Sequence, residues 1–430
     1  MKQASAQETL AIVGHSPQLA RIYAEEELLT NWAEKTLALE IDHAAFVLRE
    51  GREIGDALAS KSRDLMLHDA VAAIDRADPS KLRLLSEGHR VFALGLRQTK
   101  SGDYQTAVDT LVKARDLLER GGSPFAAWAV FYIALADYQH SDYGEALNLL
   151  GQIQTLATRG GYRSLEGRAL WLRGTILVFQ SRFTDSLIAY QQARQIFGVL
   201  GEEPNKIGVD TLLARNLELL GDSSTAWEYR IEALAGAAQT HDGHRLRVTL
   251  AEAASAIADM GEPAVARYLQ EEAVNVAERL NDPLARTAAL RQLAAIQFRM
   301  GDFAEARANL DWAREAAAAI SDNLVRQSVE TETAIVEAET NRESTPRKAL
   351  QGLDQAIANS VAMHDRLFLP SLYFERGSIA RWEIKMEPST TLLELSKSEK
   401  RSGGRFPTIR TECPTLIIAT PWSEKWSIFS

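Results

Sequence analysis

Apolar residues recur along most of this chain with the three- and four-residue spacing of amphipathic helices. Around residue 301, Leu290 and Leu293 precede a Gly301-Asp302 pair, and Leu310 follows it at the same helical spacing. Glycine adopts the positive φ that ends a helix, and aspartate caps the start of the next one. The pattern therefore predicts two helices joined by a tight turn, which is a helical hairpin.

A small residue returns five positions after each such turn. These marker residues are Ala107, Ala146, Ser186, Ala226, Ala266, Ala306 and Ala349. Their successive spacings are 39, 40, 40, 40, 40 and 43 residues. Closely crossing helices have no room for a large side chain, so a small residue is required at the contact. A lone hairpin cannot bury its apolar face, so the repetition predicts stacked hairpins in an all-α solenoid.

A second column of small residues lies seven positions before the turn. It comprises Gly95, Ala134, Gly174, Ala214, Ala254 and Ala294. Together the columns resemble the tetratricopeptide repeat (TPR), which implies a right-handed superhelical solenoid of about seven to eight antiparallel hairpins. The chain departs from that family in its period of about 40 rather than 34 residues. It also departs at Arg230 and Gln270, where an apolar residue is usual. HEAT repeats share the longer period but lack this turn, and they rank second.

The repeats divide the chain into three parts. Residues 1–16 are expected to form a flexible tail, and 17–381 the TPR-like solenoid, beginning with a degenerate hairpin of helices 39–59 and 64–77. Residues 382–430 lose the helical period and are rich in Pro, Ser and Gly, which predicts a disordered tail.

The genetic code suggests a second explanation for residues 382–430. Back-translation of residues 382–389, with each codon started on its third base, permits Leu-Gly-Asp-Lys-Asp-Gly-Ala-Ile. The turn glycine of that sequence falls at position 382, which is 81 residues, or two repeats, after Gly301. We therefore hypothesise that the coding sequence shifts frame near Arg381, a hypothesis that the nucleotide sequence of the gene decides.

Composition and charge narrow the classes of function. The 430 residues are 46% hydrophobic and carry a net charge of −10 without a basic block, which argues against a nucleic-acid partner. Cys413 is the single cysteine, and no segment has the apolar length of a signal peptide core or membrane span. These features favour a cytoplasmic protein without a membrane partner.

Signatures of catalysis, cofactor binding and metal binding are missing. The chain has no Gly-x4-Gly-Lys-Ser/Thr, Gly-x-Ser-x-Gly or His-Glu-x-x-His motif, so we expect no enzyme activity and no cofactor. The two histidines of residues 241–244 are interpreted as a surface loop rather than a metal site, for want of a third ligand nearby. The acidic run Glu25–Glu27 is interpreted as a solvated helix face.

The functional surface expected of a solenoid is its concave groove. By the TPR resemblance, groove-facing positions lie on the first helix of each hairpin. The binding candidates are His89, Phe92, Trp128, Phe131, Tyr138, Arg168, Trp171, Arg215 and Arg291. Aromatic and arginine side chains are enriched at binding hot spots. The alternative is that Trp128, Phe131 and Trp171 pack between hairpins as core, as large apolar residues usually do.

The sequence favours a non-catalytic scaffold that binds a protein or peptide partner. Residues 372–377 (Leu-Tyr-Phe-Glu-Arg-Gly) and the alanine-rich repeats resemble the repeat half of bacterial proteins in which TPRs precede a CHAT domain, a caspase-like peptidase. In the shifted frame, residues 413–419 can spell a linker like the one before that domain. Two alternatives stay open: a ligand-sensing TPR region of a bacterial transcriptional regulator, and an enzyme with an unrecognised site. Oligomeric state is not predicted.

Overall fold

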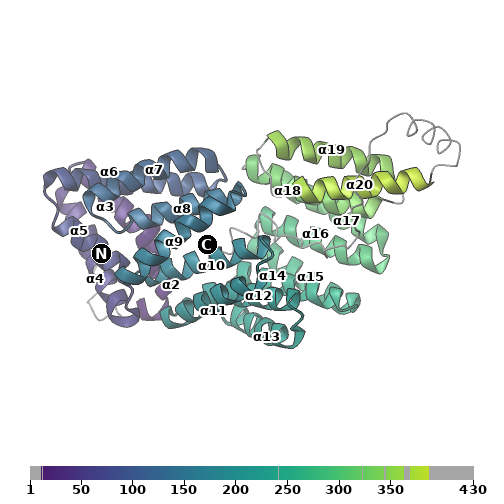
Figure 1. Cartoon of the computed structure of the whole chain (residues 1–430), viewed down its shortest axis with the longest axis horizontal. Coiled ribbons are helices and arrows are strands. Elements are labelled where there is room, and N and C mark those ends of the chain that lie inside the picture. Colours follow the sequence, from purple (N-terminus) through teal and green to yellow (C-terminus); the bar gives the residue numbers. More distant parts are fainter. Residues whose placement is uncertain are drawn as a thin grey trace. The chain divides into compact units, whose positions relative to one another are not determined.

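Helices form the whole regular structure of this chain in the part that can be described (Figure 1). The computed structural model describes residues 11, 13–240, 242–321, 323–342, 345–362 and 369–386. Within those ranges the backbone contains no β-strand. The predicted all-α architecture of stacked helical hairpins is confirmed.

The chain divides into two compact units, the first ending at Ala253 and the second beginning at Ala254. The first unit opens with five helical segments, which are α2 (Pro17–Tyr23), the π-helix η1 (Ala24–Leu28), α3 (Leu29–Leu37), α4 (Ile41–Ser62) and α5 (Met66–Asp75). Four hairpins follow, made by α6 (Pro79–Lys100) with α7 (Tyr104–Gly121), α8 (Ala126–Gln139) with α9 (Tyr143–Gly160), α10 (Arg163–Phe179) with α11 (Phe183–Leu200), and α12 (Glu203–Leu219) with α13 (Ser223–Thr240).

Helix α14 (Gly243–Asp259) contains the division between the units. The other helices of the second unit are α15 (Pro263–Leu280), α16 (Pro283–Met300), α17 (Phe303–Ala318), α18 (Asn323–Asn341), α19 (Pro346–Ala362) and α20 (Leu369–Met386). Within this unit α16 packs against α17 and α18 against α19. The two units are therefore built from the same kind of hairpin.

The turns and small-residue columns have the roles that the sequence predicts. All seven marker residues are buried, from Ala107 at 0% exposure to Ala349 at 5%. A Cβ atom added to Gly95 would lie 2.8 Å from the Leu111 side chain, so the two helices approach too closely for anything larger. The turn residue has positive φ in glycines such as Gly301, at 84°, and also in Ser141 and Ser181, at 65° and 58°. Close helix crossing thus explains both columns.

The capping prediction holds at only some turns. The side chains of Asp103 and Asp222 accept hydrogen bonds from the backbone N–H groups of Thr106 and Thr225. Asp302 makes no such bond at the start of α17. Positive φ at the turn residue, rather than aspartate capping, is therefore the common element of the described turns.

Three expectations for segments outside the regular repeats need revision. Ala11 and residues 13–15 are helical and Val13 is 2% exposed, so the described end of the N-terminal segment is packed rather than loose. Gly243 and His244 open α14 instead of lying in a loop. Helix α20 continues to Met386, five residues beyond the predicted boundary at 381. Residues 387–430, and with them most of the hypothetical frame-shifted segment, lie outside the described residues.

The core of the first unit joins its N-terminal helices to its repeats. One cluster of buried apolar residues includes Leu28 and Trp32 from the N-terminal helices, Phe131 and Trp171 from α8 and α10, and Leu213 from α12. In the second unit the buried clusters are smaller and rich in alanine, as at Ala294, Ala306 and Leu310. The N-terminal helices are thus part of the folded core of the first unit.

Candidate helix-docking site in the first unit

Most of the predicted binding residues are buried. Side-chain burial is nearly complete for His89, Phe92, Trp128, Phe131, Tyr138, Arg168, Trp171 and Arg291. The side chain of Arg215 is 22% exposed. A side chain without exposed surface cannot meet a ligand in this conformation, so the structure favours the core alternative for the aromatic candidates.

The aromatic candidates pack against other rings of the same helix, of the same hairpin or of the next hairpin. Trp128 and Phe131 pack edge to face at 5.6 Å between ring centroids, within α8. Tyr138 packs on Phe179 of the next hairpin at 5.8 Å, and Trp171 on Phe197 of its own hairpin at 5.8 Å. The Tyr138 and Trp171 contacts join neighbouring helices, and large buried rings contribute strongly to stability.

The predicted arginines Arg215 and Arg291 form ion pairs with the following first helix. Arg215 on α12 lies 3.8 Å from Glu252 on α14, and both residues belong to the first unit. Arg291 on α16 pairs with Glu332 on α18 in the second unit, where both side chains are buried. Arginine at these positions therefore connects neighbouring repeats.

The N-terminal helices lie against the first helices of three repeats in the first unit, α6, α8 and α12. Trp32 of α3 packs edge to face on His89 of α6, with 6.0 Å between ring centroids. Glu26 of η1 forms a 2.6 Å ion pair with Lys100 at the end of α6. Because Lys100 is the last residue of α6, these two contacts span much of that helix.

The next contact toward the N-terminus is made by the buried carboxylate of Glu25. The Tyr132 hydroxyl of α8 donates a 2.6 Å hydrogen bond to Glu25 Oε1. Burial raises the pKa of Glu25 above its usual value, against the opposing effects of the Arg168 charge and the Tyr132 hydrogen bond. Burial lowers the pKa of Arg168, but the charges of Glu25 and Glu202 outweigh it and raise that pKa overall. Arg168 also lies over the Trp128 ring, 5.4 Å from its centroid.

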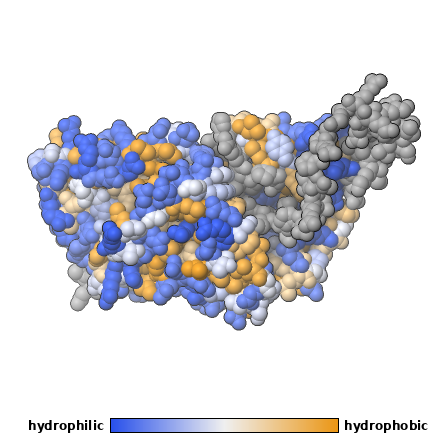
Figure 2. All heavy atoms as spheres, in the orientation of Figure 1, coloured by the Kyte–Doolittle hydropathy of each residue, from blue (hydrophilic) through white to orange (hydrophobic). Residues whose placement is uncertain are grey.

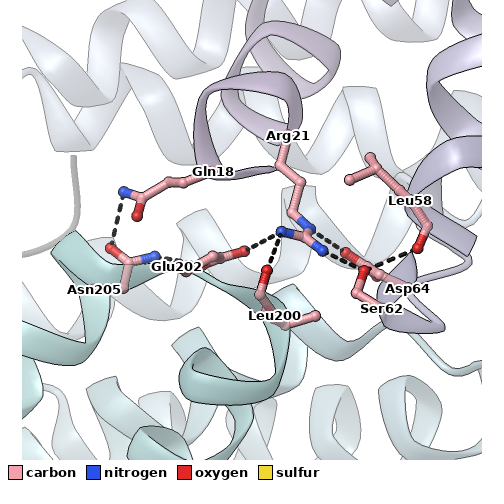
Figure 3. A network of polar contacts seen from close by, with 8 residues as sticks. All are labelled: Gln18, Arg21, Leu58, Ser62, Asp64, Leu200, Glu202 and Asn205. Carbon is pink, nitrogen blue, oxygen red and sulfur yellow. Dashed lines mark hydrogen bonds and ion pairs between the residues drawn. The ribbon is translucent and has the colours of Figure 1, made fainter. Parts of the chain in front are cut away.

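Arg21 of α2 is the centre of a second buried network (Figure 3). Its Nε donates to Asp64 Oδ2 at 2.7 Å and its Nη2 to Ser62 Oγ at 2.6 Å. Its Nη1 donates to the Leu200 carbonyl at 3.3 Å and lies 3.2 Å from Glu202 Oε1. Burial raises the pKa of Asp64, although Arg21 opposes this shift. Arg21 thus joins the α4–α5 connection to the start of α12.

Gln18 makes the last contact in this series. Its amide donates to Asn205 Oδ1 at 3.3 Å, and Asn205 donates in turn to Glu202 Oε2 at 2.6 Å (Figure 3). Asn205 and Glu202 are almost fully buried. The docked segment, defined as residues 17–37, therefore follows the repeats in reverse chain order, from α12 at Gln18 to α6 at Trp32.

We define the docking face as the six residues of the repeats that receive this segment, which are His89, Lys100, Tyr132, Arg168, Glu202 and Asn205. Sequence reasoning identified His89 and Arg168 but missed the other four. It also placed Glu25 on a solvated face, which is wrong, because Glu25 is 5% exposed. A usable signal exists in the docked segment, since Gln18, Arg21, Glu25, Leu28 and Trp32 repeat at alternating three- and four-residue spacings. That spacing marks one helical stripe, in which three polar residues share the buried side with two apolar ones.

The outer surface gives a weaker indication of a binding site. On the face drawn in Figure 2, hydrophobic residues lie in separate groups between hydrophilic ones. Exposed apolar side chains of the first unit include Ile188 on α11 and Ile231 on α13, at 50% and 63% exposure. Single exposed apolar residues are common on protein surfaces and do not define a site. Among the described helices, none combines the length and apolar character needed to cross a membrane.

Comparison with known proteins supports the fold. No protein-family model and no curated protein matches the sequence. Among solved structures, the apo form of the quorum sensor NprR from B. thuringiensis is similar with a TM-score of 0.54 and 14% identity, covering 86% of this chain and 97% of that one. NprR in complex with its cognate peptide NprX is similar with a TM-score of 0.50 and 13% identity, covering 84% of this chain and 98% of that one.

A Rap protein complexed with Competence and Sporulation Factor gives a TM-score of 0.50 and 12% identity, covering 83% of this chain and 98% of that one. At such low sequence identities, the similarity to these structures shows the fold alone. In fold, this chain is a TPR-like helical repeat protein.

Proposed function

We propose that this chain is a non-catalytic scaffold that binds a protein or peptide partner through the first helices of its repeats. One observation carries the proposal: the docking face already holds a helical segment, which contacts α6, α8 and the start of α12 through ion pairs and hydrogen bonds. Binding of an amphipathic helix by a row of helices is a common mode of peptide recognition. Of the similar structures, NprR is in complex with its cognate peptide NprX and the Rap protein with Competence and Sporulation Factor.

The finer assignment has two forms. The alanine-rich repeats and residues 372–377 support a sensing region of a TPR–CHAT type protein, whose peptidase domain would be encoded downstream. The likeness in fold to a quorum sensor supports the alternative of a ligand-sensing TPR region of a transcriptional regulator. The two forms differ in what adjoins the repeats, so DNA sequence on both sides of this coding region distinguishes a caspase-like domain from a helix-turn-helix. Both forms are compatible with a cytoplasmic protein that binds no nucleic acid through its repeats.

Side-chain burial decides which variants suit a binding test. Trp171 is fully buried, so Trp171→Ala would remove core packing, at a cost of about 3–5 kcal/mol, whether or not it binds a partner. Arg215 is partly exposed and its pair with Glu252 is 3.8 Å long, so Arg215→Ala leaves the core intact. A matched control is Arg182→Ala, which removes an exposed arginine from the α10–α11 turn.

The test is selection of 20-residue peptides from a displayed random library on the immobilised full chain. The proposal predicts enriched peptides whose binding, followed by fluorescence anisotropy, weakens at least tenfold in Arg215→Ala and is unchanged in Arg182→Ala. Circular dichroism checks that both variants keep wild-type helicity. Equal effects of the two substitutions on peptide binding would contradict a binding role for the first helices of the repeats.

A further inference from the structure

The contact between the docked segment and the docking face contains three buried polar side chains beside its buried apolar ones. Gln18, Arg21 and Glu25 are all less than 10% exposed, and each meets a polar or charged side chain of the repeats. Buried ion pairs lose much of their Coulomb energy to desolvation, so they add specificity more reliably than stability. Interfaces that open and close are likewise more polar than permanent ones.

The buried charges are also unequal once Asp64, which lies beside this contact in the α4–α5 connection, is included. Within 17–37 and the residues that receive it, Arg21 and Arg168 face three buried carboxylates, which belong to Glu25, Asp64 and Glu202. Lys100 adds a positive charge only at the partly exposed pair with Glu26. The order of these charges along the segment is therefore specific, but the two buried arginines do not neutralise all three buried carboxylates.

The docked segment is interrupted at its centre. The π-helix η1, Ala24–Leu28, separates the α-helices α2 and α3. Such π segments are rare inside α-helices and occur frequently at functional sites. Here it contains Glu25 and Glu26, which meet α8 and α6, respectively. Glu25 and Glu26, which contact the docking face, therefore lie in the irregular part of the backbone.

The connection from the docked segment to α4 is a short turn with an exposed surface. Leu39 has φ of 60°, a left-handed conformation that a leucine rarely adopts. Leu39 and Ile41 are 81% and 75% exposed, so neither side chain fixes this connection by packing. The docked segment therefore ends at an exposed turn, which backbone hydrogen bonds from Leu39 N to Thr36 O and from Glu40 N to Lys35 O close.

We infer that residues 17–37 are an exchangeable occupant of the docking face. The partner that replaces them is an amphipathic helix that presents an arginine, a glutamate four residues later and an aromatic residue seven residues after that, as Arg21, Glu25 and Trp32 do. This inference rests on the proposed function and specifies the partner of the same face. The segment then acts as an intramolecular competitor, which the partner displaces.

A tethered competitor is present at an effective concentration on the order of millimolar, so a free helix competes poorly unless the tethered one is weakened. The probe is a fluorescein-labelled synthetic peptide of residues 13–39. We expect it to bind the full-length Arg21→Ala/Glu25→Ala variant at least tenfold more tightly than the wild-type chain. The same two substitutions in the peptide should weaken its binding to that variant at least tenfold. Equal binding to both chains would overturn the inference.

A covalent lock provides a control that does not depend on weakened packing. In a Cys413→Ser background, Gln18→Cys and Asn205→Cys place two thiols where side chains now meet, and a short bismaleimide joins them. The linked chain should not bind the peptide, even when it carries the Glu25→Ala substitution. The matched control is the same protein with both thiols capped by N-ethylmaleimide, which should bind. Equal binding by linked and capped protein would show that exchange is not required.

Amide hydrogen exchange tests the same inference without any peptide. Backbone amides of residues 17–37 should exchange at least tenfold faster than those of α8 in the wild-type chain, since the segment opens while the repeats stay folded. Equal protection of the two regions would overturn the inference. A library-selected peptide that binds the linked and capped chains equally would leave the scaffold function standing and remove only the exchange.

Discussion

Tyr132 donates a 2.6 Å hydrogen bond to Glu25, across 107 residues of sequence, and both side chains are buried. Tyr132→Phe keeps the aromatic packing but removes this donor from a buried carboxylate. Leaving a buried acceptor unsatisfied costs about 1–3 kcal/mol, so we expect a loss of stability of that size in urea denaturation. Tyr268→Phe, at a 73% exposed position, is the control and should have no effect. Equal midpoints for the two variants would mean that the bond contributes nothing.

Arg21 compensates two buried carboxylates, Asp64 and Glu202. Arg21→Met should destabilise the first unit by about 3–5 kcal/mol, because it leaves both charges buried without their cation. Adding Asp64→Asn and Glu202→Gln should restore much of the loss, since neutral amides need no counter-charge.

The control for Arg21 is the exposed ion pair of Arg182, where the change to methionine should alter stability by less than about 1 kcal/mol. Thermal and urea unfolding of the four proteins provide the comparison. If the triple variant is no more stable than Arg21→Met, shape rather than charge explains the effect.

Glu339 in the second unit should make stability depend on pH. Burial and the negative charge of Glu375 raise the pKa of Glu339 from 4.5 to about 7, against the opposing charges of Arg299 and Arg342. Between these two values the folded chain retains a proton that the unfolded chain has released. Stability therefore falls as pH rises from about 4.5 to about 7, and levels off above that.

We expect Glu339→Gln to remove this dependence and to stabilise the protein by about 1–2 kcal/mol at pH 8. Urea denaturation of wild type and variant at pH 5.5 and pH 8 measures it, and the difference between the two proteins isolates Glu339 from other carboxyl groups. A difference that does not change with pH would contradict the raised pKa.

Gly95 tests the close helix crossing. A Cβ atom there would lie 2.8 Å from Leu111, so Gly95→Ala should cost about 1–3 kcal/mol through overpacking. Gly144, in the first turn of α9, has no atom within 4 Å of its added Cβ, and Gly144→Ala should instead stabilise by about 0.5 kcal/mol. Thermal unfolding should therefore move in opposite directions for the same chemical change. Shifts of the same sign would argue that helix propensity, not crossing distance, governs the column.

The repeats could be predicted from sequence because every hairpin needs a small residue where its two helices cross. Ala107 and Ala306 occupy equivalent crossings 199 residues apart, and a single rule about side-chain size explains both. The docked segment occurs once and obeys no repeated rule. Glu25 was misassigned because its partner Tyr132 is remote in sequence, and acidic runs usually face solvent.

The burial of Phe92 escaped prediction for a similar reason, whereas burial of Trp128 was the alternative given for the groove. Both were correctly assigned to the first helices of the hairpins, but nothing local reveals how deeply their neighbours cover them. Helix and hairpin positions follow from near neighbours in sequence, whereas the identity of a covering segment depends on contacts across the whole unit.

The reverse order of the docked segment has a consequence for synthesis of the protein. Gln18 leaves the ribosome early, but Asn205 follows 187 residues later. At ordinary translation rates this interval lasts roughly 10–40 s. During that time the docked segment cannot pack on a complete docking face, although Leu28 and Trp32 are buried in the folded chain. The nascent chain therefore presents this segment to chaperones before the last of its acceptor helices has been made.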